Sequence, residues 1–359
     1  MAAGPAPPDS VLVVRLSSMG DVIHALPAVV ALRHALPETA IGWVVEERWS
    51  ELLSACGYPL NGPISEHKPL ANRVHYVRTK QWRKNILAAA TWKDLRSSLG
   101  EIRQARYNSA IDFQGAIRSA VIARWSGAKQ VVGFASPREG PAKWFYNRRV
   151  QGHGVHIIEQ NVALAAEVGK TTVAIVPAAI LPRDPAAEAW CDQYFQDNQV
   201  TKLVLMNPGA GWGAKQWPAD RYGTIARELA ADGYTVRINY GPGEEDLANV
   251  VEASSEESAR SVQCSLGELI ALTRRASLFI GGDTGPLHLA SALKVPVVAL
   301  FGPTDPARNG PFGERNIVLR KPESVTSHTR RAQPDPGLLS ITTQEVLAAA
   351  RNLLHGEDA

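Results

Sequence analysis

Three short segments of the sequence carry residue types that could bind or transform an anionic ligand. The first runs from Ser17 to His24, between an apolar stretch and a helical pattern, and contains Asp21. A carboxylate at a helix start can simply cap free backbone N–H groups. At the carboxyl edge of a sheet, with His24 one turn further on, Asp21 could also act as a general base. We predict this second role, because few other positions in the chain suit a base as well.

The second segment is a glycine-rich loop, residues 207–218, which contains Lys215. Its glycines would let the backbone approach a ligand closely, and a lysine just before a helix suits a phosphate group. The loop lacks the Gly-Lys-Ser/Thr order of a Walker loop, and it does not match the Gly-x-Gly-x-x-Gly pattern of many dehydrogenases. Its chemistry therefore indicates a phosphate site outside these two classes.

The third segment, residues 280–288, is the most informative and again has the order strand, turn, helix. Consecutive N–H groups at the helix start could hold a phosphate, and Asp283 could accept hydrogen bonds from sugar hydroxyls. His288 could point into the same site. The alternative is an aspartate-capped helix with a surface histidine. The later loop 302–306 is consistent with a rigid turn.

Apolar runs and helical spacing predict the elements that must position these segments. In the first half, residues 22–36 form a predicted helix, and the predicted strands are residues 11–16, 41–45, 74–77, 109–113 and 131–134. In the second half, the predicted helix is 219–232, and the predicted strands are 202–206, 235–240, 277–280 and 295–301. Each half is thus expected to be a parallel sheet wrapped by helices, an α/β fold.

The pattern predicts two domains with a proline-containing connection. We expect, in chain order, a disordered tail (1–10), a Rossmann-like domain (11–176), a linker (177–184), a second Rossmann-like domain (185–340) and a C-terminal helix (341–359) that could pack back on the first domain. Two doubly wound halves facing each other would place a ligand between the carboxyl ends of their strands.

Composition narrows the class of protein. The chain has 359 residues, 45% hydrophobic and 20% charged, as in a soluble globular protein, and no apolar run is long enough to cross a bilayer. Its three cysteines lie far apart, which fits a reducing cytoplasm and gives no metal-site spacing. The N-terminal residues do not resemble a signal peptide.

Charge is unevenly distributed. The net charge is only +3, yet residues 68–149 hold 17 basic and 4 acidic residues, with Trp82 and Trp92 among them. Such a region attracts a polyanion: phosphate, anionic lipid or nucleic acid. A solvated basic surface is the simpler alternative. A nucleic-acid partner is not expected, because it would leave the motif at residues 283–288 without a purpose.

Taken together, Ser17 to His24, Asp283 to His288, Lys215 and Gly302 to Pro306 resemble the glycosyltransferases that build the inner core of lipopolysaccharide, the ADP-heptose:lipopolysaccharide heptosyltransferase family. Several motifs at matching spacing are more specific than any one of them. The resemblance implies a GT-B arrangement of two Rossmann-like doubly wound domains with an interdomain cleft. The first domain would bind the acceptor and the second an ADP-heptose donor.

The same resemblance implies roles for single residues. Asp21 would deprotonate the acceptor hydroxyl, Lys215 would neutralise the donor diphosphate, and Asp283 would hold the heptose. The other implied donor-binding residues are Thr284, Gly285, His288, Glu244 and Cys264. The implied acceptor-binding residues, facing the anionic Kdo sugars and phosphates of lipid A, are Lys80, Arg83, Lys84, Arg118 and Arg138.

These roles describe an inverting glycosyltransferase that moves heptose from ADP-heptose to Kdo-lipid A, without cofactor or catalytic metal. It would be cytoplasmic and peripheral at the inner face of the inner membrane. One alternative is a relative that uses another nucleotide sugar or acceptor, and another is a nucleotide-sugar-binding protein without turnover. Residues 320–337 are a departure, because they match no stretch of the better-known relatives.

Overall fold

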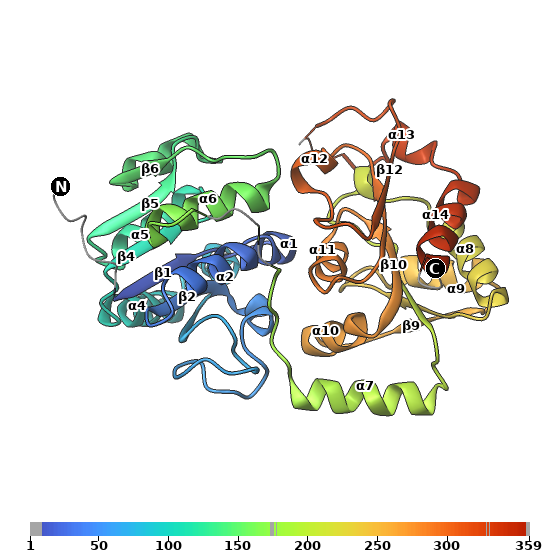
Figure 1. Cartoon of the computed structure of the whole chain (residues 1–359), viewed down its shortest axis with the longest axis horizontal. Coiled ribbons are helices and arrows are strands. Elements are labelled where there is room, and N and C mark those ends of the chain that lie inside the picture. Colours follow the sequence, from blue (N-terminus) through green and yellow to red (C-terminus); the bar gives the residue numbers. More distant parts are fainter. Residues whose placement is uncertain (1–8, 173–175, 177, 328, 330, 357–359) are drawn as a thin grey trace. The chain divides into compact units, whose positions relative to one another are not determined.

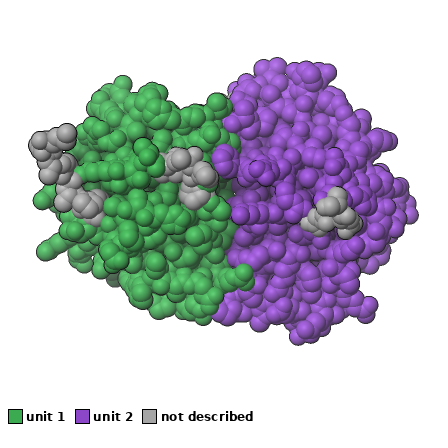
Figure 2. All heavy atoms as spheres, viewed as in Figure 1, with its two compact units in different colours: residues 1–183 green, residues 184–359 purple. Residues whose placement is uncertain are grey.

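A computed structural model of the chain describes residues 9–172, 176, 178–327, 329 and 331–356. It divides into two compact units, Met1–Arg183 and Asp184–Ala359, which Figure 2 shows in different colours. The predicted tail and linker lie partly outside the described residues, at 1–8 and at 177. In the described part of the chain, no helix is both long and apolar enough to cross a membrane.

The first unit is built on a six-stranded parallel sheet with the order β3-β2-β1-β4-β5-β6. Its strands are β1 (Ser10–Val14), β2 (Ala40–Glu46), β3 (Arg73–Val77), β4 (Ser109–Asp112), β5 (Gln130–Phe134) and β6 (Arg148–Val150). Its helices are α1 (Met19–Ile23), α2 (Leu26–Ala35), α3 (Thr79–Lys84), α4 (Ala89–Gln104), α5 (Ile117–Trp125) and α6 (Ile157–Gly169), with short 3₁₀ turns at Glu47–Leu52 and Gly140–Phe145. Figure 1 shows these helices around the sheet.

The predicted helix over residues 22–36 is two helices instead. α1 ends at Ile23 and α2 begins at Leu26. Pro27 explains the break, because proline has no N–H to donate and its ring clashes with the carbonyl four residues earlier, here that of Ile23. Asp21 therefore lies in the first turn of a separate short helix, α1.

The second unit repeats this architecture with the strand order β12-β11-β10-β7-β8-β9. Its strands are β7 (Leu203–Asn207), β8 (Thr235–Asn239), β9 (Ala259–Val262), β10 (Ala276–Gly282), β11 (Val297–Phe301) and β12 (Asn316–Arg320). Its helices are α7 (Pro185–Asp197), α8 (Ala219–Ala231), α9 (Glu245–Ser254), α10 (Leu266–Arg274), α11 (Gly285–Ala292), α12 (Pro306–Asn309), α13 (Pro336–Leu339) and α14 (Thr343–His355), with a 3₁₀ turn at Gly213–Lys215.

Both sheets have the same strand order when their strands are counted from the start of each unit. The order reverses between the first and fourth strands, which are β1 and β4 in one unit and β7 and β10 in the other. In open parallel sheets, ligands bind outside the carboxyl ends of the strands at such a switch point. The loops after β1, β4, β7 and β10 are therefore the places to look for a site.

The C-terminal helix α14 packs within the second unit. The apolar residues of α14, among them Val346, Ala350 and Leu354, lie in the core of the second unit. The helix packs there against α8 and strands β10, β11 and β12. Its apolar face is thus covered by its own sheet and by α8.

Placing a charge on the buried face of α14 tests this packing. Ala350 is fully buried, whereas its neighbour Ala348 is exposed. We expect Ala350→Asp to destabilise the protein by several kcal/mol, because a carboxylate is placed in an apolar core without a partner. Ala348→Asp is the matched control and should change stability by less than about 0.5 kcal/mol. Equal denaturant midpoints for the two variants would contradict the packing.

Candidate functional site

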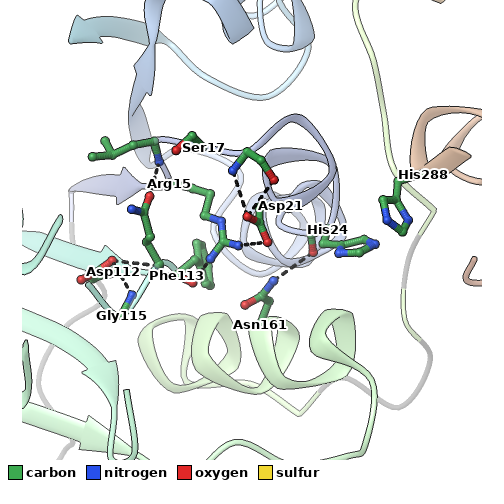
Figure 3. Close-up of polar contacts among 12 residues, drawn as sticks. Arg15, Ser17, Asp21, His24, Asp112, Phe113, Gly115, Asn161 and His288 are labelled. Carbon is green, nitrogen blue, oxygen red and sulfur yellow. Dashed lines mark hydrogen bonds and ion pairs between the residues drawn. The ribbon is translucent and has the colours of Figure 1, made fainter. Parts of the chain in front are cut away.

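Asp21 lies in the first turn of α1, directly after the carboxyl end of β1. One carboxylate oxygen, Oδ2, accepts hydrogen bonds from the backbone N–H and the hydroxyl of Ser18, both at 2.9 Å. The other, Oδ1, forms an ion pair with the Arg15 guanidinium at 2.5 Å. Figure 3 shows the Asp21 carboxylate facing Arg15. The aspartate is thus both a helix cap and one half of an ion pair.

These contacts set the charge of Asp21. Burial raises the pKa of its carboxyl, but the Arg15 guanidinium and the two hydrogen bonds from Ser18 outweigh burial and hold the pKa below its ordinary value. The side chain is still 33% exposed, so a ligand can reach it. Asp21 is therefore an ionised, accessible carboxylate at neutral pH, which is the form that can accept a proton.

The loop after β4 fixes the position of the Arg15 side chain. Its guanidinium donates to the Phe113 carbonyl, and the side chain is only 6% exposed. The fully buried Asp112 shapes that loop by accepting from the N–H groups of Gln114 and Gly115 at 2.9 and 3.2 Å. Burial raises the pKa of Asp112 despite these hydrogen bonds. We infer that Asp112 has a structural role, because it lies inside the loop and away from solvent.

Two of the predicted acceptor residues lie beside Asp21. Arg118 donates to the Ser17 hydroxyl at 3.4 Å. The positive charge of Arg138 contributes to the lowered pKa of Asp21. Both arginines are exposed. Together with Arg15 they make the surroundings of Asp21 cationic.

The sequence analysis placed His24 one helical turn after Asp21, but the His24 ring does not face the Asp21 carboxylate (Figure 3). Its ring packs edge-on against the ring of His156, with centroids 5.6 Å apart, and its carbonyl accepts from Asn161 at 3.0 Å. In Figure 3 the ring points away from the Asp21 carboxylate. Arg15 and Ser18, and not His24, orient the carboxylate.

The other predicted acceptor residues, Lys80, Arg83 and Lys84, lie on α3. Nearby cations, foremost Arg48 and then Arg83 and Lys84, lower the pKa of Lys80 together with partial burial. The lowered pKa means that these positive charges lie close together and repel one another. α3 follows β3, so this cationic group lies at the same sheet edge as Asp21, two strands away.

The turn after α3 exposes apolar side chains next to these cations. Ile86, Leu87 and Trp92 are 57%, 97% and 47% exposed, and the Trp92 indole donates to the Ile86 carbonyl at 2.9 Å. Trp82 differs, since it packs against the core of the unit and its indole donates to Asp94 at 2.7 Å. Of the two tryptophans that the sequence analysis singled out, only Trp92 is a surface residue.

In the second unit, three predicted donor residues form one network. The Asp283 carboxylate accepts from the Lys215 ammonium at 2.5 Å through one oxygen and lies 3.0 Å from Nε2 of His288 through the other. Lys215 comes from the loop after β7 and Asp283 from the loop after β10, the two strands at the switch point. The Lys215 ammonium also lies 5.5 Å from the centre of the Trp212 ring.

This network keeps Asp283 ionised. Burial raises its pKa, but His288 and Lys215 outweigh burial and hold the pKa of Asp283 far below its ordinary value. An ionised carboxylate of this kind can accept hydrogen bonds, as the predicted role of Asp283 toward sugar hydroxyls requires.

The start of α11 lies beside this network. Thr284 is the N-cap residue, and its hydroxyl donates to the Asn207 side chain at 3.2 Å. Gly285 is the first residue of the helix, and Pro286, the second, has no N–H to offer. The expected row of consecutive N–H groups is therefore interrupted at Pro286, although the helix start still favours an anion.

Glu244 and Cys264 lie further along the same sheet edge. The Glu244 carboxylate accepts from the Gly241 N–H at 2.8 Å and packs so closely on Gly209 that a Cβ there would lie 2.1 Å from it. Burial raises the pKa of Cys264 to about 12, so its thiol stays protonated. Its sulfur lies 3.9 Å from the Asn239 amide. The loop after β8 thus places Glu244 against the loop that carries Lys215, and Cys264 lies beside Asn239 at the end of β8.

Sequence reasoning missed Arg15, Arg48 and Asn207. Arg15 had a usable signal, because a basic residue directly after an apolar strand lies at the carboxyl edge of a sheet. Asn207 ends β7, and its amide donates to the Asn239 carbonyl at 2.8 Å, which joins the carboxyl ends of β7 and β8. Among the residues described, no group of three or more His, Cys, Asp and Glu side chains could hold a metal ion.

Comparisons with known proteins agree with this arrangement. The model of glycosyltransferase family 9 (heptosyltransferase) matches residues 95–337. Lipopolysaccharide heptosyltransferase 1 of Pseudomonas aeruginosa is 32% identical over 320 residues, which cover 86% of this chain and 83% of that protein. The Escherichia coli K12 protein of the same name is 28% identical over 349 residues, which cover 96% and 99%.

Solved structures resemble the fold. The structure of E. coli heptosyltransferase WaaC with ADP has a TM-score of 0.77 at 24% identity and covers 96% of this chain and 99% of its own. The family 9 glycosyltransferase from Veillonella parvula has a TM-score of 0.82 at 22% identity, covering 99% of both chains. These likenesses, with the two parallel sheets, confirm the expected GT-B fold class.

The lowered pKa of Asp283 predicts a pH-dependent stability. A carboxyl with a depressed folded-state pKa contributes stability above its unfolded pKa of about 3.9, and this contribution is lost as the pH falls below that value. We expect Asp283→Asn to lower the free energy of unfolding at pH 7 and the difference from the wild type to shrink below about pH 4. Urea unfolding at both pH values measures this difference. A difference that stays constant to pH 3 would contradict the prediction.

Proposed function

Because this chain belongs to glycosyltransferase family 9, the heptosyltransferases, we propose that it transfers heptose from ADP-heptose to Kdo-lipid A in lipopolysaccharide inner-core synthesis. Relatives named lipopolysaccharide heptosyltransferase 1 support this acceptor class. The donor is supported by the E. coli WaaC structure with ADP-2-deoxy-2-fluoro heptose, which is 25% identical, has a TM-score of 0.74 and covers 96% of this chain and 99% of its own.

The observation that carries the proposal is the network of Lys215, Asp283 and His288 beside the start of α11. A diphosphate needs positive charge, which the Lys215 ammonium and the helix N-terminus supply. The sugar needs hydrogen-bond acceptors, which the ionised Asp283 supplies. We propose that Glu244 on the neighbouring loop accepts from the ribose and that the backbone around Cys264 receives the adenine.

Asp21 is the proposed base. As the acceptor hydroxyl attacks the anomeric carbon, its proton passes to the Asp21 carboxylate and the bond from that carbon to the diphosphate oxygen breaks. ADP leaves with increased negative charge, which Lys215 and the start of α11 stabilise. A single displacement of this kind inverts the anomeric centre.

The cationic side chains of the first unit are proposed to bind the acceptor. Arg118 and Arg138 lie beside Asp21, and the α3 cations lie at the same edge of the sheet. Kdo carboxylates and lipid A phosphates complement this charge. The exposed Leu87 and Trp92 next to α3 suit the headgroup layer of the membrane that carries the acceptor, so we propose peripheral contact with the cytoplasmic face of the inner membrane.

Incubation with ADP-heptose and Kdo-lipid A tests the reaction, since the product should gain the mass of one heptose. We expect Asp21→Asn to lower kcat about 10² to 10⁴-fold, because the amide keeps the size of the carboxylate but takes no proton. ADP affinity should stay within about threefold, because the ADP-binding residues belong to the second unit. Glu38→Gln, which makes the same carboxylate-to-amide change at an exposed position just before β2, is the matched control and should leave kcat unchanged. An Asp21→Asn enzyme with wild-type turnover would refute the base.

Charge reversal on α3 tests acceptor binding. We expect Arg83→Glu combined with Lys84→Glu to raise the acceptor KM at least about tenfold and to reduce sedimentation with anionic liposomes at low salt, because each cation near such a surface contributes about 1 kcal/mol. The donor KM should not change.

The chain offers a matched control for this pair. Arg124 and Lys129 are exposed cations of the same unit, but they lie at the end of α5 and just before β5, at the opposite edge of the sheet. Arg124→Glu with Lys129→Glu makes the same change of charge and should leave the acceptor KM near the wild-type value. Equal effects of the two pairs would show that only overall charge matters.

A further inference from the structure

The segment between β12 and α13, of which residues 321–327, 329 and 331–335 are described, contacts the loop that carries Lys215. The Arg331 carbonyl accepts from the Ala214 N–H at 3.0 Å, and the Asp335 N–H donates to the Ala214 carbonyl at 3.2 Å. Both backbone groups of the residue before Lys215 are therefore held by one segment. The sequence analysis found no counterpart for residues 320–337 in the better-known relatives, but the family model spans them, since it matches residues 95–337.

The same segment also holds the loop after β11. The Ser327 N–H donates to the Pro303 carbonyl at 2.8 Å. At the end of β12, the Arg320 side chain donates to the Gly302 carbonyl at 3.2 Å and to the Thr326 hydroxyl at 2.9 Å. The segment thus contacts both the loop after β7 and the loop after β11, which are far apart in the sequence.

A buried hydrogen bond closes the segment on itself. The Asp335 carboxylate accepts from the Ser324 hydroxyl at 2.5 Å and, through the same oxygen, from the Leu338 N–H at 3.1 Å. Asp335 and Ser324 are 8% and 6% exposed. Since buried polar groups without partners are costly, the pair holds the two ends of the segment together.

The fit against the Lys215 loop is tight. A Cβ at Gly213 would lie only 1.7 Å from the Ala332 carbonyl oxygen, and one at Gly302 would lie 3.1 Å from the Asp335 Cβ. Glycine is therefore the residue that this contact admits at position 213. The 3₁₀ turn that carries Lys215 packs directly against the segment and has no room to shift toward it.

We propose that residues 324–327 and 331–335 of this segment form a clasp that positions Lys215 for the donor diphosphate, with Asp335 and Ser324 as positioning residues. The inference rests on the proposed donor site. The Lys215 ammonium sits on a long, flexible side chain. The position of the Lys215 backbone therefore decides which region the ammonium can reach. A clasp that fixes the Ala214 peptide in advance lowers the ordering cost of binding ADP.

A double-mutant cycle read by calorimetric titration with ADP tests the clasp. We expect Asp335→Ala to raise the Kd for ADP about tenfold, whereas Asp335→Asn, which keeps an acceptor oxygen, should stay within about twofold. In the Lys215→Ala background, Asp335→Ala should add almost nothing. If the clasp only stabilised the fold, the two effects would be independent.

Two further variants add a milder disruption of the clasp and a control. Ser324→Ala removes a single hydrogen bond, so it should show a smaller loss of affinity in the same direction even where Asp335→Ala folds poorly. Lys321→Gln breaks the ion pair with Glu345, 2.5 Å in length, and leaves the Ala214 contacts intact, so ADP affinity should not change.

The outcomes separate the clasp from the donor site. If Lys215→Ala weakens ADP binding but neither Asp335→Ala nor Ser324→Ala does, the clasp is refuted and the donor site stands. Additive losses in the cycle also refute the clasp. If Lys215→Ala leaves ADP affinity unchanged, the proposed donor site and the clasp are both refuted.

Discussion

A carboxylate at the edge of a buried sheet is stable as an anion only where cations or hydrogen-bond donors replace its lost water. Each unit meets this condition where its strand order reverses. Asp21 is compensated by Arg15 and Ser18, and Asp283 by Lys215 and His288. Removing any of these partners would leave a half-buried charge, so the geometry of both loops follows from charge neutralisation rather than from apolar packing.

Most of the fold could be predicted from apolar runs, because the central strands are buried on both faces and read as continuous Val, Leu and Ile. Three strands were missed, β6, β9 and β12, and all three lie at sheet edges. An edge strand buries less, and residues such as Arg148 in β6 or Arg260 in β9 hide its pattern. Pro27 marked the break between α1 and α2, yet the apolar spacing continued across it.

The candidate site, like the fold, could be predicted from the sequence only in part. Asp21, Lys215, Asp283 and His288 could be placed from strand-turn-helix order, because the carboxyl ends of parallel strands meet at one edge. The partner of Asp21 could not, since which cation reaches a carboxylate depends on side-chain geometry and not on spacing. The contacts of Arg331 and Asp335 with Ala214 were also beyond prediction, because they join backbone groups more than a hundred residues apart whose side chains carry no signal.

The two units share one strand order although the sequence shows no clear repeat. A parallel sheet constrains only the apolar residues of its strands, and it leaves the loops at its carboxyl edge free to differ. In the first unit these loops gather arginines and lysines, which suits a polyanionic acceptor. In the second they gather glycines that admit close backbone approach, such as Gly209 against Glu244 and Gly213 against Ala332. Under the proposed roles, substitutions in the loops of the first unit should change acceptor recognition without disturbing the nucleotide site, and substitutions in the second unit should do the reverse.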